Sequence, residues 1–385
     1  MKIVADANIP LLADAFGPLG EVVALPADRI TADAVRDADA LLVRSVTRVD
    51  RALLDSSAVR FVATATIGFD HLDQAYLAAR GIAWASAAGS NARSVAEYVL
   101  AAIHTLAEAD GFRVADKVLG VVGCGHVGGR LARMAAGIGI RVLQNDPPLA
   151  RLTGDPKYVP IEALAEADII TFHVPLERAG PDATYHMIDE RLLASLKRGA
   201  MVINSSRGGV ADSEALKKTV DSGHVGALVL DVWENEPNID LDLLDRVRLA
   251  TPHIAGYSYD GKVNGTRRVL EAFCKHFGLR RDWDPSPLMP PPVTPRVVLA
   301  RGVTAQEAVR QAIRAAYDIE ADDGRLRAIA GRAPGERGRF FIALRKNYPV
   351  RREFPLVTAE LEAADAKVKS VLRALDFRLE VCCAR

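Results

Sequence analysis

Short apolar segments alternate with segments of helical periodicity along the first part of the chain. The strand-like segments are residues 3–5, 21–23, 40–43, 61–63 and 82–84. Segments that fit a helix fall between them, as at residues 31–36 and 72–79. This alternation predicts a parallel sheet with helices on both faces, because parallel strands need crossover connections.

A longer helical segment, residues 90–109, leads into a second alternating part. We interpret it as a connector between two α/β units, because its apolar side chains recur at helical spacing. Glu97 on this helix could be functional, but we expect a lone carboxylate there to be a solvated or capping-type charge. The strand-like segments that follow are residues 118–122, 140–144, 168–172, 200–204, 227–231 and 247–250. Their uninterrupted apolar character is typical of strands buried on both faces.

The end of the chain has a different pattern. After a helical segment at residues 259–278, residues 282–295 concentrate prolines, which exclude helix and most sheet. Helical spacing resumes at residues 309–316, and residues 377–381 alternate as a half-buried strand. This pattern predicts a linker followed by a separate, small α+β module. We therefore expect an α/β chain, with two doubly wound parallel-sheet domains of Rossmann-like or flavodoxin-like type before that module.

Composition narrows the classes of function. Lys plus Arg equals Asp plus Glu, at 49 each, so net charge does not indicate nucleic acid or an anionic membrane as a partner. No apolar run of about 18 residues is present, and the first residues fit a strand better than a signal peptide. The cysteines have neither metal-ligand spacing nor a disulfide pattern: Cys124, Cys274, Cys382 and Cys383. We therefore expect a cytoplasmic protein without a metal site.

A glycine motif, Gly123-x-Gly125-x-x-Gly128, follows the first strand of the second part. The first glycine suits a tight turn, the second lets backbone approach a pyrophosphate, and the third lets the helix at 126–138 pack on the strand. That helix also presents its N-terminal N–H groups to phosphates. Asp146, at the end of the next strand, can accept hydrogen bonds from both ribose hydroxyls and repels a 2′-phosphate. In this context the motif predicts NAD rather than NADP.

Three polar loops follow predicted strands of the same sheet, at residues 204–209, 231–237 and 251–256. They carry Arg207, Glu236 and His253, which a parallel sheet can bring together at the carboxyl ends of its strands. The arginine offers a fork for a carboxylate, the histidine can take a hydroxyl proton, and the glutamate can hold the other imidazole nitrogen. Taken singly, they are typical of a surface arginine, a loop glutamate and a core histidine. Together they favour oxidation of a 2-hydroxy acid.

Two loops of the first part, residues 44–47 and 64–68, are also rich in polar groups. Ordinary turn chemistry explains such loops. A ligand site explains them equally well, because both loops end strands of one small sheet. Both interpretations stay open at this point.

These motifs together resemble the D-isomer-specific 2-hydroxyacid dehydrogenases, over about residues 1–280. In that family Arg, Glu and His stand in this order in these loops, which matches Arg207, Glu236 and His253. The resemblance implies that these three residues are catalytic. It also implies residues that line the NAD site: Gly123, Gly125, His126, Val127, Gly128, Asp146, Ser206, Arg207, Asp231 and Gly256.

A closer match within that family is to a branch whose members oxidise a phosphorylated hydroxy acid and form homodimers through a C-terminal domain. Residues 43–47, 66–73 and 253–258 and the proline-led tail carry this match, whereas Ala7 and residues 88–90 depart from it. The match implies that Ser45, Thr66 and Tyr257 contact the substrate. It also implies a substrate-binding domain at 1–92 and 258–281, an NAD-binding domain at 93–257 and a dimerisation domain at 282–385.

The phosphate of such a substrate needs cationic partners. Arg44 stands beside Ser45, and we expect it to bind the phosphate; a dense basic group occupies residues 345–352. One residue of that group is expected to reach the phosphate from the partner subunit, with a solvated basic face as the alternative. Two other functions stay open: a D-2-hydroxyacid dehydrogenase with another substrate, such as 3-phosphoglycerate, and a non-catalytic NAD-sensing protein.

Overall fold

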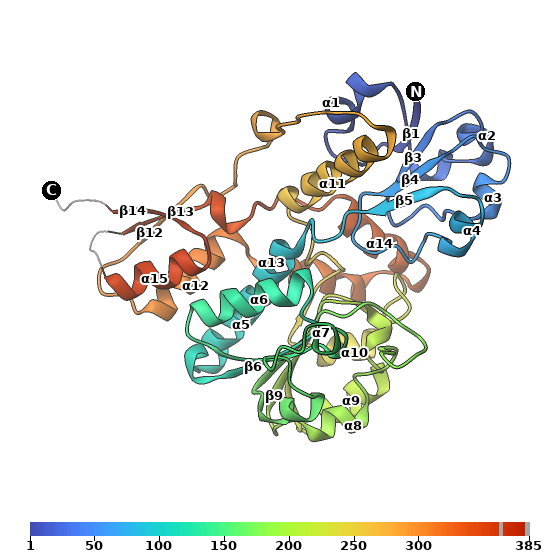
Figure 1. Ribbon diagram of the computed structural model, residues 1–385. Coiled ribbons are helices and arrows are strands. Elements are labelled where there is room, and N and C mark those ends of the chain that lie inside the picture. The colour runs from blue at the N-terminus through green and yellow to red at the C-terminus, as the bar shows by residue number, and fades with distance from the viewer. Residues whose placement is uncertain (362–364, 382–385) are drawn as a thin grey trace. The chain divides into compact units, whose positions relative to one another are not determined.

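The computed structural model describes residues 1–361 and 365–381. The chain divides into two compact units: Met1–Asn91 with Ser258–Pro290, and Ala92–Tyr257 with Pro291–Arg385. Each unit contains one doubly wound parallel sheet, as the alternation of strands and helices predicted (Figure 1).

The sheet of the first unit has five parallel strands in the order β2-β1-β3-β4-β5. They are β1 (Lys2–Asp6), β2 (Glu21–Leu25), β3 (Ala40–Val43), β4 (Phe61–Thr64) and β5 (Ala83–Ser86). Successive side chains of a strand point to opposite faces, so Leu41 and Leu42 enter two separate cores. Because β3 and β4 are parallel neighbours, the loops that follow them leave the same edge of the sheet.

Helices cover both faces of this sheet. One face carries α1 (Leu12–Phe16) and α11 (Tyr259–Phe277), and the other carries α2 (Ala32–Val35), α3 (Arg51–Leu54) and α4 (Gln74–Ala79) (Figure 1). Phe273 anchors α11, because its ring meets those of Phe16 and Phe61 edge-on at 5.5 and 6.0 Å. The chain thus returns to the first unit after residue 257, which periodicity alone does not reveal.

The sheet of the second unit has six parallel strands in the order β11-β10-β9-β8-β6-β7. They are β6 (Val118–Val122), β7 (Arg141–Asn145), β8 (Ile169–Phe172), β9 (Ala200–Asn204), β10 (Val225–Leu230) and β11 (Leu249–Ala250). The strand order reverses between β6 and β8. In open sheets of this kind ligands bind in the crevice at the reversal, so the loops after β6 and β8 are where a cofactor belongs.

Two helices, α5 (Ala92–Asp110) and α6 (His126–Gly137), cover one face of this sheet. The other face carries α8 (Glu190–Ser195), α9 (Ser213–Asp221) and α10 (Leu241–Arg246). Because α5 is buried along most of its length, Glu97 is only 2% exposed, and the expectation of a solvated charge was wrong. Its Oε1 accepts a hydrogen bond from the Phe354 N–H at 3.0 Å.

The last part of the chain shares a core with the second unit. Its strands β12 (Arg296–Leu299), β13 (Thr358–Leu361) and β14 (Arg378–Val381) form a parallel sheet with β13 at the centre. Its helices are α12 (Ala305–Ala316), α13 (Ile319–Arg327), α14 (Pro334–Lys346) and α15 (Ala366–Ala374). Of these, α12 and α13 contact α5, and α15 contacts α6 (Figure 1). The segment thus packs on the second unit, and its function as a dimerisation domain stays a prediction.

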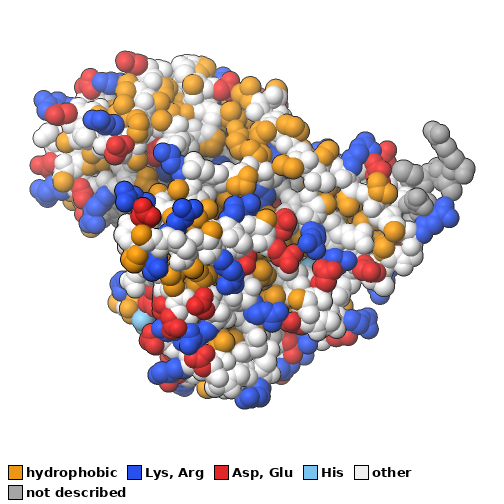
Figure 2. Space-filling model, turned by 180° about the vertical axis from the view of Figure 1, so that it is seen from behind, with side chains coloured by type: hydrophobic (Ala, Val, Ile, Leu, Met, Phe, Trp, Pro, Cys, Tyr) orange, Lys and Arg blue, Asp and Glu red, His pale blue; other side chains and the backbone are white. Residues whose placement is uncertain are grey.

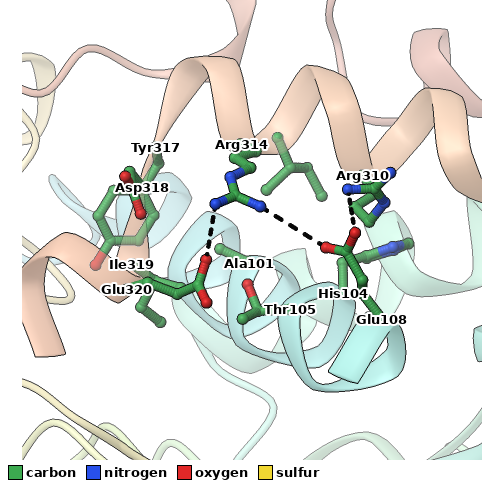
Figure 3. Close-up of a pocket in the computed structure, with 11 residues that line it drawn as sticks. Ala101, His104, Thr105, Glu108, Arg310, Arg314, Tyr317, Asp318, Ile319 and Glu320 are labelled. Carbon is green, nitrogen blue, oxygen red and sulfur yellow. Dashed lines mark ion pairs between the residues drawn. The ribbon is translucent and has the colours of Figure 1, made fainter. Parts of the chain in front are cut away.

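A small pocket marks the contact between α5 and α12 (Figure 3). Glu108 of α5 pairs there with Arg310 and Arg314 of α12, at 2.7 and 3.8 Å. Arg314 also pairs with Glu320 at 3.2 Å. Because these side chains are partly exposed, the pairs orient the helices more than they stabilise them. His104 beside them is neutral at pH 7, because burial and the charge of Arg310 lower its pKa to about 4.

Charged side chains of both signs are scattered over the face shown in Figure 2, between hydrophobic and uncharged ones. On the face shown in Figure 2, Lys and Arg lie interspersed with Asp and Glu, in keeping with their equal numbers in the sequence. Mixed charge of this kind gives that face no strong field of either sign. Within the part of the chain that the structure describes, no helix is both long enough and apolar enough to cross a bilayer.

Candidate active site

The glycine turn after β6 has the geometry that the motif predicted. Gly123 adopts φ 82°, and a Cβ there would lie 2.7 Å from the His173 carbonyl oxygen. A Cβ on Gly128 would lie 1.9 Å from the Gly123 carbonyl oxygen, so glycine at this position lets α6 approach the turn. No atom lies within 4 Å of the Cβ position of Gly125, which leaves its backbone open to a ligand. The turn therefore fits a pyrophosphate at the N-terminus of α6.

Asp146 at the end of β7 holds the same turn. Its Oδ2 accepts a hydrogen bond from the Cys124 N–H at 2.7 Å. Its Oδ1 accepts one from the Leu149 N–H at 2.9 Å, which caps α7 (Pro147–Thr153). A carboxylate has about four acceptor positions, so two remain for ribose hydroxyls. Burial raises the pKa of the Cys124 thiol to about 12, so the side chain is a neutral thiol at pH 7.

The other residues predicted to line a cofactor site stand at helix and strand ends of the same unit. His126 is exposed and, with Val127, forms the first turn of α6. Ser206 follows β9 and is 6% exposed, and its Oγ donates to Asn204 Oδ1 at 2.7 Å. Gly256 lies in the loop after β11. Contact of these residues with NAD stays a prediction.

Arg207 lies in the loop between β9 and α9. Its Nη1 donates to the Ser206 carbonyl oxygen at 2.9 Å, and its own carbonyl oxygen accepts from Asn204 Nδ2 at 3.1 Å. A Cβ on Gly208 would lie 1.9 Å from the Trp233 carbonyl oxygen. Glycine at this position therefore lets the arginine loop pack directly on the loop after β10.

Glu236 and His253 are in contact. His253 Nδ1 lies 2.8 Å from Glu236 Oε2, and Glu236 Oε1 accepts a hydrogen bond from the Trp233 N–H at 2.8 Å. Because an ionised carboxylate only accepts, Nδ1 carries the proton and Nε2 is the nitrogen that can take another. The histidine and glutamate side chains are 32% and 19% exposed, so a substrate can reach the imidazole.

Glu236 is held in its ionised form. Burial alone would raise the pKa of its carboxyl group, but several neighbours together hold that pKa below its ordinary value. They are the charge of His253, hydrogen bonds from His253 and from the Trp233 N–H, and the charge of Arg345. An ionised Glu236 fixes the imidazole tautomer and stabilises the protonated ring, which is what a general base requires.

Asp231, predicted to line the NAD site, is 1% exposed and clamps the loop that carries His253. Its Oδ1 accepts hydrogen bonds from Thr251 Oγ1 and the Ile254 N–H, both at 2.7 Å. Its Oδ2 accepts from the Ala255 N–H at 2.9 Å, and its carbonyl oxygen accepts from the His253 N–H at 2.7 Å. Sequence reasoning missed this clamp, because an aspartate that ends a strand is equally typical of a cofactor site.

The predicted substrate residues Ser45, Thr66 and Arg44 belong to the first unit. Ser45 is exposed after β3, and Thr66 follows the neighbouring parallel strand β4. Thr66 Oγ1 lies 2.7 Å from Thr64 Oγ1 and donates to the Gly68 carbonyl oxygen at 3.0 Å. The half-buried guanidinium of Arg44 has no hydrogen-bond or ion-pair partner among residues 1–361 and 365–381. It is therefore available to an anion, and its contact with substrate stays a prediction.

The basic stretch near the end of the chain lies largely inside its own subunit. Arg351 and Arg352 are 6% and 7% exposed. Arg351 Nη2 donates to the Ala255 carbonyl oxygen at 2.5 Å and to Ser94 Oγ, and its guanidinium carbon lies 4.2 Å from the centre of the Tyr317 ring. This placement does not fit the prediction for Arg351, because a side chain engaged in its own subunit is not available to reach a partner's substrate.

A doubly wound sheet whose glycine turn accepts a pyrophosphate, beside a paired glutamate and histidine, is typical of NAD-dependent dehydrogenases. Residues 85–255 match the family model described as D-isomer specific 2-hydroxyacid dehydrogenase, NAD binding domain. Residues 288–375 match a domain of unknown function (DUF3410). The protein is thus an NAD-dependent oxidoreductase of this class.

Curated relatives match over nearly the whole chain. Erythronate-4-phosphate dehydrogenase from Marinobacter nauticus is 44% identical over 99% of this chain and 100% of its own. The protein of the same name from Sodalis glossinidius is 46% identical over 98% of each chain. This chain belongs to the erythronate-4-phosphate dehydrogenase family.

Solved structures share the fold of about three quarters of the chain. D-lactate dehydrogenase from Aquifex aeolicus, complexed with NAD and lactic acid, is 23% identical, with a TM-score of 0.59 over 72% of this chain and 96% of that one. Pyruvate reductase from Chlamydomonas reinhardtii is 26% identical, with a TM-score of 0.57 over 73% and 97%. The predicted fold class and the predicted NAD cofactor are confirmed.

Proposed function

We propose that this protein oxidises 4-phospho-D-erythronate at C2 to (R)-3-hydroxy-2-oxo-4-phosphooxybutanoate with reduction of NAD, in the biosynthesis of pyridoxal 5′-phosphate. The contact between His253 Nδ1 and Glu236 Oε2 carries the proposal, because it prepares the imidazole to take a hydroxyl proton. The choice of substrate is supported by relatives named erythronate-4-phosphate dehydrogenase, which match over nearly the full length of the chain.

In the proposed reaction His253 is the general base. Its Nε2 takes the proton of the C2 hydroxyl, and ionised Glu236 stabilises the imidazolium that forms. Arg207 offers its planar fork to the substrate carboxylate and to the oxygen that becomes the carbonyl. NAD, when bound, accepts the hydride that leaves C2. Arg207, Glu236 and His253 are thus the proposed catalytic residues.

The proposed cofactor site belongs to the NAD-binding domain at 93–257. The glycine turn would hold the pyrophosphate, and Asp146 would hold the adenosine ribose with its two remaining acceptor positions. Residues proposed to complete the site are His126, Val127, Ser206, Asp231 and Gly256.

The proposed substrate contacts are Ser45, Thr66 and Tyr257, with Arg44 on the phosphate. The guanidinium of Arg44, which has no partner among residues 1–361 and 365–381, supports this assignment, because a cationic donor makes a charge-assisted hydrogen bond to an anion. Residues 1–92 with 258–281 would form the substrate-binding domain. We further propose a cytoplasmic homodimer that pairs through residues 282–385.

Side-by-side measurement of NADH formation tests the function. The purified protein is assayed with 4-phosphoerythronate, 3-phosphoglycerate and D-lactate, with His253→Ala as the control for background reduction. We expect the highest kcat/KM with 4-phosphoerythronate. A higher value with 3-phosphoglycerate would assign another dehydrogenase activity, and NAD binding without turnover of any substrate would indicate an NAD-sensing protein.

A further inference from the structure

Arg345 lies in the last turn of α14, against a residue of the proposed substrate site. Its guanidinium carbon is 5.6 Å from the centre of the Tyr257 ring. The Tyr257 ring in turn meets the Tyr348 ring edge-on at 5.9 Å, so it is held between the two residues. A cation over an aromatic face is an attractive arrangement, which fixes the guanidinium beside Tyr257.

One donor of Arg345 is buried without a partner. Its Nε has no hydrogen-bond acceptor among the described residues, although the atom is shielded from solvent. Leaving a buried donor of a charged group unsatisfied is unfavourable, and in native proteins such donors are rare. The Nη1 and Nη2 atoms of Arg345 also have no acceptor among the described residues, and unlike Nε they are not shielded from solvent. A ligand can therefore supply the acceptor for this guanidinium.

The charge of Arg345 also reaches the proposed catalytic pair. Burial raises the pKa of Glu236, and the charge of Arg345 is one of the neighbouring contributions that together hold this pKa below its ordinary value. Arg345 is therefore near enough to act on an anion bound at the imidazole. The other basic residues of 345–352 are placed differently, because Lys346 is exposed whereas Arg351 and Arg352 are buried within the subunit.

We propose that Arg345 binds the phosphate of the substrate within its own subunit. The proposal rests on the proposed function, in which the substrate carries a carboxylate at one end and a phosphate at the other. Arg207 already offers a fork to the carboxylate end, which is bonded to the reacting carbon. A planar guanidinium suits phosphate oxygens, because its donors match them in a bidentate pair.

Kinetics on a matched pair of substrates test the proposal. Arg345→Gln removes the charge, Arg345→Lys keeps it without the fork, and Lys346→Gln is the control at the exposed neighbouring position. We expect Arg345→Gln to raise KM for 4-phosphoerythronate on the order of 10- to 100-fold, the loss of a charge-assisted contact. Its effect on KM for unphosphorylated erythronate should be far smaller. For 4-phosphoerythronate, the KM of Arg345→Lys should lie between that of the unmodified protein and that of Arg345→Gln.

If Arg345 acted on Glu236 and not on the substrate phosphate, the kinetics of its variants would differ from those expected above. Arg345→Gln would then change kcat for both substrates equally and move the pH profile of both, which would overturn the proposal. Unchanged kinetics with 4-phosphoerythronate would overturn it as well. We also expect inorganic phosphate to inhibit erythronate oxidation by the unmodified protein and to inhibit Arg345→Gln more weakly.

Failure of the proposed function is distinguishable from failure of this inference. If the unmodified protein oxidises 3-phosphoglycerate and not 4-phosphoerythronate, the proposed function fails and the same comparison is made with 3-phosphoglycerate and glycerate. If no substrate is oxidised, calorimetric titration with inorganic phosphate replaces kinetics. Equal phosphate affinity of Arg345→Gln and the unmodified protein would then overturn the inference.

Discussion

At the scale of single residues, the backbone of His253 is held in a conformation that residues with a Cβ seldom adopt. It has φ 58°, in the left-handed region. Hydrogen bonds from the N–H groups of His253, Ile254 and Ala255 to Asp231 stabilise this conformation. Strain that is held by its surroundings is concentrated at functional sites, where it aims a side chain. Here the imidazole is aimed at Glu236.

Replacing His253 by alanine removes the proposed base. We expect kcat with 4-phosphoerythronate to fall on the order of 10²–10⁴-fold, the usual contribution of general base catalysis. Affinity for NAD should change little, because the glycine turn lies in another loop. Steady-state kinetics and fluorescence titration with NADH would measure the two effects, with His276→Ala on the exposed side of α11 as the control. Full activity of His253→Ala would place the base elsewhere.

Glu236→Gln tests the electrostatic part of the pair. Glutamine keeps the size of the side chain and an acceptor for Nδ1–H but lacks the charge that stabilises imidazolium. The loss of this charge should therefore lower kcat and move the acidic limb of the kcat/KM profile to lower pH. Glu234→Gln is the matched control, because Glu234 pairs with His186 at 2.7 Å. A limb that stays in place would contradict the assigned role.

Asp146 is expected to set the choice of cofactor. Asp146→Ala should weaken the binding of NAD and reduce the discrimination against NADP, because the charge that repels a 2′-phosphate is lost. The carboxylate also bonds to the Cys124 and Leu149 N–H groups through its two oxygens, so Asp146→Asn, which keeps one of these acceptors, removes the charge with a smaller structural change than Asp146→Ala. Comparison of kcat/KM for the two cofactors is the measurement. Equal use of NADP by the unmodified protein would refute the assignment.

The roles of single residues could be predicted where the spacing of residues in a motif requires one backbone geometry. Gly123 and Gly128 are examples, because the spacing of the fingerprint encodes a turn and a close helix approach. The clamp made by Asp231 and the contact of Arg351 with Ala255 could not be predicted. In both cases the bonding groups are backbone N–H and C=O, whose directions depend on the folded loop and not on residue type.

At the scale of helices and strands, the strands could be placed closely. Buried parallel strands are continuously apolar, so the predicted segments 118–122 and 200–204 coincide with β6 and β9. The last strand of that sheet is shorter than the predicted 247–250 and covers Leu249–Ala250. The environment of Glu97 on α5 could not be predicted, because its partner Phe354 lies 257 positions later.

Glu97 should make the stability of the second unit depend on pH. Burial raises its pKa well above the ordinary value, and the neighbouring charge of Glu353 adds to this, against smaller opposing contributions from the Phe354 N–H, Arg93 and Arg351. The folded protein therefore keeps a proton that the unfolded chain releases near pH 4.3. Stability contributed by the neutral carboxyl group is present below that pH and is lost as the pH rises towards the folded-state pKa.

Glu97→Gln should remove this dependence, because the amide is neutral and still accepts from the Phe354 N–H. We expect similar free energies of unfolding for the variant and the unmodified protein at low pH. As the pH rises, the free energy of unfolding of the variant should exceed that of the unmodified protein by up to about 1.4 kcal/mol more per pH unit. Urea unfolding across pH 5 to about 8 would measure this, with Glu108→Gln on the exposed part of the same helix as the control. If the free energy of unfolding depended on pH in the same way for Glu97→Gln and the unmodified protein, the prediction would be contradicted.

At the scale of the whole molecule, the proline segment suggested a linker to an independent module. The structure instead places Val309, Ala312 and Ile313 of α12 in the same hydrophobic cluster as residues of α5 and α6. An amphipathic pattern predicts that one face of a helix is buried but does not identify what buries it. For that reason the sequence could indicate the helix and not its neighbour.

Because of this shared core, removing the C-terminal segment would test the stability of the second unit and not only its dimerisation. Removal of residues 291–385 would uncover apolar positions of α5 that are now buried, such as Tyr98, whose ring centre lies 6.3 Å from that of Tyr317, and Ala101, which lines the pocket beside Ile313. We therefore expect a chain that ends at Pro290 to be insoluble or to unfold at a much lower temperature, whatever its subunit composition. Thermal unfolding of the truncated protein, compared with the full-length protein, is the measurement.

The proposed homodimer is accordingly tested on the intact chain. We expect the segment added to the α/β dehydrogenase fold to pair with a second copy of itself about a two-fold axis, the commonest symmetry of soluble oligomers. Sedimentation of the full-length protein at micromolar concentration should give the mass of two chains. Salt should change that mass little, because paired apolar surface is not screened as surface charges are. A monomer under these conditions would refute dimerisation and leave the segment with the role of completing the core beside α5.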